Sequence, residues 1–157
     1  MIRIVTDTTA VLPKEIIGKY QITVVPQVIC FGEDSYLEGI EIDEPEFLRR
    51  LVLSPTLPGT AAPSPALFDE VYRCAAEHGD TVLSIHPSAE VSGTIESAFV
   101  ARSQYPQADI RIIDSRTIAG CLASIVQLAA EWASIGVCAD EIADRIQYLI
   151  PRARTYF

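Results

Sequence analysis

Residues 81–99, "TVLSIHPSAEVSGTIESAF", decide the fold class, because they change from a strand pattern to a helix pattern across a short polar loop. Residues 81–86 are mostly apolar, which predicts a buried strand. A helical pattern then runs from about residue 94 to residue 105 and stops before Pro106. The loop between them holds serines, a glycine and a threonine. A strand followed by a helix is the repeating unit of α/β proteins.

The same unit recurs along the chain. Residues 2–6 and 109–114 are further strand patterns, and residues 117–135 and 139–150 carry apolar residues at helical spacing. Other helices are predicted to begin at Pro13, at Asp43 and at Ser64, which are residue types found at helix starts. Because strands and helices alternate, we expect an α/β fold. Its architecture is predicted to be a three-layer sandwich with a largely parallel sheet flanked by helices.

Two segments depart from this alternation. The run 22–31 is extended, although Pro26 weakens its middle, and a turn at 32–34 leads into a second extended run. We expect a small hairpin there. Residues 54–65, "SPTLPGTAAPSP", contain four prolines and a glycine and predict a long loop. Loops of that length in compact domains are often functional.

The composition predicts one globular domain. The chain has 157 residues and a formal net charge of −9, from 12 basic and 21 acidic side chains. This balance disfavours nucleic acid as a partner, because phosphates are bound by Lys and Arg. No apolar window is long enough to predict an integral membrane segment, and the start "MIRIVTD" does not read as a signal peptide. The cysteines form no CxxC motif and each lies in an apolar context, so we expect buried, reduced thiols and a cytoplasmic location: Cys30, Cys74, Cys121 and Cys138.

Polar segments are predicted to gather at one edge of the sheet. The segments "TDTT" (6–9), "HPSAEVSGT" (86–94) and "DSRT" (114–117) each follow a strand, and "GTAAPSP" (59–65) precedes a helix. Ligands of open α/β sheets bind outside the carboxyl ends of the strands. Hydroxyl groups and free backbone N–H groups at helix starts suit a single carboxylate or phosphate. Simple helix capping by Ser64 and Ser92 is the competing interpretation.

A serine hydrolase site and a metal or cofactor site are the two catalytic alternatives. A Ser92–His86–Asp114 hydrolase is conceivable, because His86 and Asp114 end neighbouring strands and Ser92 lies in the loop between them. The G-x-S-x-G elbow that often carries such a serine is absent. With only two histidines and scattered acidic residues, we expect no metal site and no cofactor.

The order of these motifs resembles the DegV family. "IRIVTDTTAVLP" is similar to the family's opening, and "GTAAPSP" corresponds to its "TSQPSP" loop. "SAEVSGTIESA" and "IIDSRTIAG" correspond to its "SS.LSGTyqSA" and "viDSktvs.G" segments. The resemblance extends over essentially the whole chain, residues 1–157.

The resemblance implies a bacterial fatty-acid-binding protein that is not an enzyme. By motif position, Thr60 and Ser92 would bind the carboxylate of a long-chain fatty acid. The supporting loop residues would be Ser64, Gly93, Thr94, Asp114 and Ser115. Some members present the bound fatty acid to a separate fatty acid kinase, so a kinase partner in phospholipid metabolism is implied. The chain departs from the family pattern where Ala61-Ala62 replaces Ser-Gln.

The family pattern would continue beyond this sequence. Residues 1–157 correspond to a DegV-like N-terminal domain, and the C-terminal domain that covers the lipid is expected to be absent from this chain. An interdomain face left exposed in this way would favour a homodimer. A truncated domain that has lost its ligand is the remaining alternative.

Overall fold

The computed structural model describes residues 1–156, and its centre is a parallel sheet of four strands. The strands are β1 (Ile2–Asp7), β2 (Thr23–Val25), β6 (Thr81–His86) and β7 (Ile110–Asp114), in the order β2-β1-β6-β7. All neighbouring pairs in this sheet are parallel. The carboxyl ends of the strands therefore lie at one edge, as the sequence predicted.

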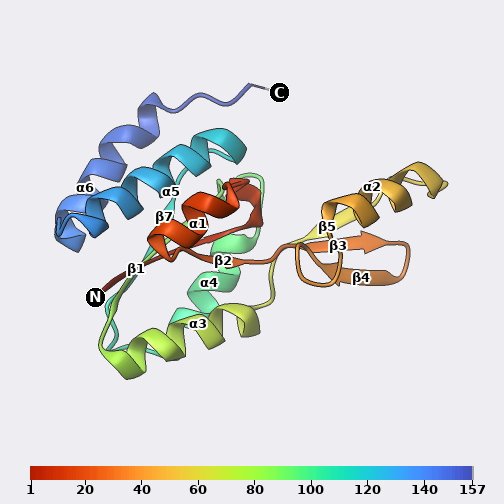
Figure 1. The fold of residues 1–157 in the computed structure, drawn as a ribbon. Coiled ribbons are helices and arrows are strands. Elements are labelled where there is room, and N and C mark those ends of the chain that lie inside the picture. The colour runs from red at the N-terminus through yellow and green to blue at the C-terminus, as the bar shows by residue number, and fades with distance from the viewer. Residues whose placement is uncertain (157) are drawn as a thin grey trace.

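Helices cover both faces of the sheet and confirm the three-layer sandwich (Figure 1). One face carries α1 (Lys14–Tyr20), α5 (Ala119–Ser134) and α6 (Ala139–Leu149). The other face carries α3 (Pro65–His78) and α4 (Thr94–Arg102). Two 3-10 turns, η1 (Thr8–Ala10) and η2 (Ile150–Arg152), follow β1 and α6.

The alternation of side chains along β6 explains why both faces can be covered. Leu83 and Ile85 are fully buried in the core on the α5 side. Val82 belongs to the core on the α3 side. Ser84 and His86 share that α3 face, because successive side chains of a strand point to opposite faces. Two polar residues thus occupy a buried strand face, and their hydrogen bonds are described below.

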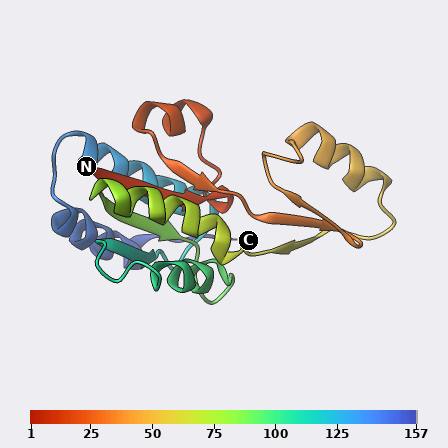
Figure 2. The same cartoon turned by 90° about the horizontal axis from the view of Figure 1, so that it is seen from below.

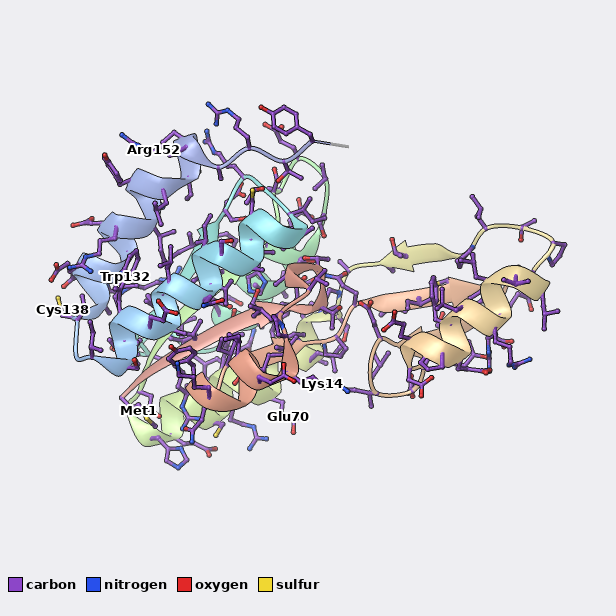
Figure 3. All side chains as sticks on the ribbon, turned by 45° about the horizontal axis from the view of Figure 1, so that its top comes forward. Met1, Lys14, Glu70, Trp132, Cys138 and Arg152 are labelled. Atoms are coloured by element: carbon purple, nitrogen blue, oxygen red, sulfur yellow. The ribbon has the colours of Figure 1, made fainter. Side chains whose placement is uncertain are left out.

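A smaller antiparallel sheet stands beside the sandwich (Figure 2). It consists of β4 (Asp34–Leu37), β3 (Val28–Phe31) and β5 (Gly59–Ala61), in that order, with α2 (Glu44–Leu53) packed nearby. Figure 3 shows that Met1 and Cys138 lie at the opposite end of the sandwich. The small sheet is therefore next to the carboxyl ends of the parallel strands.

Two sequence predictions need correction here. The run 22–31 is not one strand, because β2 and β3 belong to different sheets and the chain leaves the first sheet at Pro26 and Gln27. The segment 54–65 is not wholly loop, because residues 59–61 form β5 and pair with β3. The predicted hairpin is confirmed as β3 and β4.

The helix starts follow the sequence only in part. Asp43 caps α2 by accepting a 2.9 Å hydrogen bond from the Glu46 backbone N–H. The reciprocal bond of a capping box is not formed, because the Glu46 carboxylate pairs with Arg49 and Arg50. Ser64 occupies the cap position of α3, but its hydroxyl makes no capping bond.

Among residues 1–156, no helix is long and apolar enough to cross a bilayer. All four cysteines are free thiols, as expected, but the expectation that they are buried is wrong. Cys30, Cys74 and Cys121 are partly exposed, and Cys138 is exposed at the cap position before α6.

Candidate ligand-binding cleft

A cleft of about 670 Å³ lies where the small sheet meets the carboxyl edge of the parallel sheet. Its walls come from η1, β3, α2, β5, the loop after β6 and the start of α5. A second hollow, of about 500 Å³, lies around Gly79 and Pro106, away from the hydroxyl-bearing loops. The larger cleft is the candidate site, because it lies where open α/β sheets bind their ligands.

The two residues expected to bind a carboxylate both line this cleft. Thr60 lies on β5, where its backbone pairs with Ile29, and it is exposed. Ser92 lines the cleft from the loop that follows β6. Gly93 also lines the cleft and has an ordinary backbone φ of −75°. An added Cβ there would meet Ala62 at 3.8 Å, an ordinary contact, so the fold itself does not require glycine at this position.

Below the cleft surface, Ser92 is connected to a buried hydrogen-bond network. The Ser92 Oγ is 2.8 Å from the Thr94 Oγ1 and accepts a 3.3 Å hydrogen bond from the Thr94 backbone N–H. Thr94 is fully buried at the start of α4. Its Oγ1 accepts a 2.9 Å hydrogen bond from the Gln27 Nε2. Thr94 therefore connects Ser92 to Gln27, and the supporting role that the resemblance implies for it stays a prediction.

The Asp7 carboxylate anchors this network. Its Oδ1 accepts from the Gln27 Nε2 at 3.0 Å and from the Thr9 Oγ1 at 2.6 Å, and its Oδ2 lies 2.7 Å from the His86 Nδ1. Burial alone would raise the pKa of Asp7. The hydrogen bond and charge of His86, together with donors from Thr9 and Gln27, instead hold that pKa below its ordinary value. Asp7 is therefore a buried, ionised acceptor.

His86 is a structural part of this network and is fully buried. Its Nε2 lies 2.7 Å from the Ser84 Oγ, which is 2.8 Å from the Tyr72 hydroxyl. Phe68 packs edge-on against the imidazole at 5.2 Å between ring centroids. Burial raises the pKa of Tyr72 to about 12, although its bond to Ser84 opposes this. The Tyr72 hydroxyl therefore stays protonated.

This arrangement corrects the hydrolase hypothesis. Both ring nitrogens of His86 are occupied, by Asp7 and Ser84, and neither is bonded to Ser92. Asp114 accepts a 2.8 Å bond from the Arg116 backbone N–H instead of orienting His86. A Ser92–His86–Asp114 triad is therefore not assembled, because the acid that holds the histidine comes from β1 and not from β7.

The other predicted supporting residues lie outside the cleft walls. Ser64 is exposed at the start of α3. Ser115 is buried, and its backbone N–H donates to the His86 carbonyl at 3.1 Å. Asp114 and Ser115 thus stabilise the turns after β7 and are not among the residues that face the cleft.

Among residues 1–156, no group of three metal-ligating side chains lies close enough together to hold an ion.

Several cleft residues were not singled out from the sequence. Gln27 was missed, although a glutamine directly after Pro26 in an apolar run is an unusual feature that can mark a buried polar role. The Thr8 hydroxyl accepts a 3.0 Å bond from the Gln27 backbone N–H and donates to the Glu38 carboxylate. The apolar part of the cleft wall was missed as well, because its residues come from five separate segments: Val11, Ile29, Phe47, Val91 and Ile118.

Comparisons with known proteins agree with this fold. A DegV-domain protein of Clostridium perfringens is 41% identical over 145 residues, which are 92% of this chain and 52% of that protein. The structure described as DegV, a fatty acid binding protein from Bacillus subtilis, matches with a TM-score of 0.88 and 30% identity over 96% of this chain and 54% of that one. A stearic acid-binding protein of Eubacterium ventriosum matches with a TM-score of 0.87 and 30% identity, over 94% of this chain and 52% of that one.

The chain spans about half the length of these relatives. A family model described as "Uncharacterised protein, DegV family" matches residues 1–157. The sequence motifs, the three-layer sandwich with its small antiparallel sheet, and these matches lead to one conclusion: the chain belongs to the DegV family.

Proposed function

We propose that this chain binds a long-chain fatty acid, with the carboxylate held at Thr60 and Ser92 and the acyl chain lying along the apolar part of the cleft. The observation that carries the proposal is the position of these two hydroxyl groups in the walls of one cleft of about 670 Å³. Relatives of the same fold are described as fatty-acid-binding proteins. Pockets for small ligands typically enclose roughly 300–1,000 Å³, so the cleft is of suitable size.

The polar part of the cleft suits one carboxylate on an otherwise neutral ligand. No lysine or arginine is among the residues that line it. The carboxylate would therefore be held by hydroxyl and backbone N–H donors, which suffice for a singly charged group. Among the described residues that line the cleft, the one acidic side chain is Glu38, which already accepts a hydrogen bond from Thr8.

The apolar part suits an acyl chain. Ile29, Phe47 and Ile118 come from the small sheet, α2 and the segment before α5, so they surround the cleft from different sides. Burial of each CH₂ group contributes about 0.8 kcal/mol when it is complete. Affinity should therefore rise with chain length until the chain extends beyond the cleft.

The role that fits this site is recognition without turnover. The hydrolytic triad is not assembled, so the bound carboxylate would be presented unchanged, for example to a separate fatty acid kinase. A second domain, which the family resemblance implies, would cover the exposed side of the lipid. The unpaired cysteines are consistent with a cytoplasmic location. We also propose a homodimer, formed through the face that such a second domain would otherwise cover.

Native mass spectrometry of the chain purified from bacteria, followed by denaturing extraction, tests the proposal. A co-purifying fatty acid should be present in the wild type and lost in the Thr60→Val, Ser92→Ala double variant. Ser64→Ala is the matched control, because Ser64 neighbours the cleft in sequence but its hydroxyl makes no cap bond.

Titration with saturated fatty acids of increasing length then measures the apolar contribution. Wild-type chain that carries no lipid and binds none in titration would refute the proposal for this chain. It would favour a domain that has lost its ligand or needs its second domain.

A further inference from the structure

A buried chain of hydrogen bonds connects the core of the sandwich to the cleft. It runs from Asp7 through Gln27 and Thr94 to Ser92, and all but Ser92 are buried. The cleft chemistry described above uses only the last hydroxyl. The remaining residues come from three separate elements, namely the end of β1, the link between β2 and β3, and the start of α4.

The chemistry of Asp7 fixes the orientation of Gln27. An ionised carboxylate only accepts hydrogen bonds, so the group of Gln27 that faces it must be the amide NH₂. The same nitrogen lies 2.9 Å from the Thr94 Oγ1, so the two amide protons are donated to Asp7 and to Thr94. The Gln27 backbone N–H, held by Thr8, keeps the side chain in this position.

A count of donors then fixes the direction of the next bond. The Thr94 Oγ1 accepts from Gln27, and its own proton has one neighbouring acceptor, the Ser92 Oγ at 2.8 Å. If Ser92 donated instead, the Thr94 proton would be left without a partner at a fully buried position, which is costly. The Ser92 Oγ thus accepts from the Thr94 hydroxyl and from the Thr94 backbone N–H.

We propose that Gln27 is a positioning residue: it sets the direction of the Thr94–Ser92 hydrogen bond, so that the Ser92 proton is presented to the cleft. The site then selects headgroups that accept hydrogen bonds and rejects those that only donate them, such as an alkylammonium ion. The identity of the ligand in this inference rests on the proposed function. The direction of the hydrogen bonds does not depend on any ligand.

A neutron structure of lipid-extracted, deuterated crystals of the chain tests the direction without any ligand. The expected map places the Thr94 hydroxyl deuteron toward Ser92 and both Gln27 amide deuterons toward Asp7 and Thr94. A Ser92 deuteron aimed at Thr94 would overturn the proposal, whether or not the protein binds a fatty acid.

Binding of palmitate to matched variants tests the consequence. Thr94→Val keeps the volume of the side chain and removes its hydroxyl, whereas Thr94→Ser keeps the hydroxyl. We expect Thr94→Val and Gln27→Met each to weaken palmitate binding about tenfold, and Thr94→Ser to restore most of the affinity. Urea denaturation shows whether each variant folds. If either Thr94→Val or Gln27→Met does not fold, palmitate binding by the other variant decides the test.

Repeating both substitutions in a Ser92→Ala background separates positioning from general damage. If Gln27 and Thr94 act through the Ser92 hydroxyl, their effects should fall below about twofold in that background. Equal losses with and without Ser92 would mean that they only support the structure, and would overturn the proposal. Absence of any palmitate binding by the wild type would refute the proposed function instead, and the neutron map alone would then decide the positioning role.

Discussion

Substitution of Asp7 by Asn should destabilise the fold far more than a change at a surface ion pair. The change keeps the volume of the side chain but removes the charge and replaces one acceptor oxygen by an NH₂ group. That group must then face either the His86 Nδ1 or the Gln27 Nε2, which now donate to the two carboxylate oxygens. Both Asp7 and His86 are fully buried, so water cannot compensate.

The expected loss in the free energy of unfolding at pH 7 is about 2 kcal/mol or more, because leaving a buried polar group without its hydrogen-bond partner costs about 1–3 kcal/mol. Urea denaturation followed by circular dichroism measures it. Glu141→Gln is the matched control, because Glu141 and Arg145 form a 2.6 Å pair on the exposed face of α6. The control should lose at most about 0.5 kcal/mol.

Asp7→Asn should also change how the free energy of unfolding depends on pH under acidic conditions. The folded pKa of Asp7 lies below its unfolded value near 3.8, so its ionised form stabilises the fold. That contribution is complete above the unfolded pKa and is lost as the pH falls through the folded pKa. Wild-type stability should therefore fall below about pH 4 more steeply than that of Asp7→Asn. A loss at pH 7 no larger than the control's, with parallel acid limbs, would refute the role assigned to this carboxylate.

Three further predictions concern caps and glycines, and each is measured by urea denaturation. Asp43→Ala should cost about 1 kcal/mol, because it removes the cap bond to Glu46, whereas Ser64→Ala should be nearly neutral; equal losses would contradict the cap assignment. Gly79→Ala should destabilise by about 1 kcal/mol, because Gly79 has a φ of +66° at the end of α3. Gly18→Ala should stabilise by roughly 0.5–1 kcal/mol, since Gly18 lies inside α1 with open space around it; a loss there would show an unseen contact.

The carboxylate-binding proposal could be reached from the sequence because its residues lie in local motifs. Ser92 and Gly93 sit between a strand and a helix, and Thr60 sits in a proline-rich segment before another helix. Parallel strands place their following loops at one edge, so local motifs become neighbours once the sheet is recognised. The supporting roles of Ser64 and Asp114 were implied only by the family resemblance, and the structure places neither residue in the cleft wall. Proximity in sequence to a motif does not determine which way a side chain points.

Sequence by itself determined the parts of this protein that depend on local periodicity and composition. The parallel sheet, its flanking helices and the DegV motifs are all carried by residues close together along the chain. Only the tertiary structure decided that Asp7, and not Asp114, holds His86, and that Gln27 connects Asp7 to Thr94. These contacts join residues separated by 20 to 79 positions. Their partners are chosen by the order of the strands and by the need to satisfy every buried polar group, which no local pattern encodes.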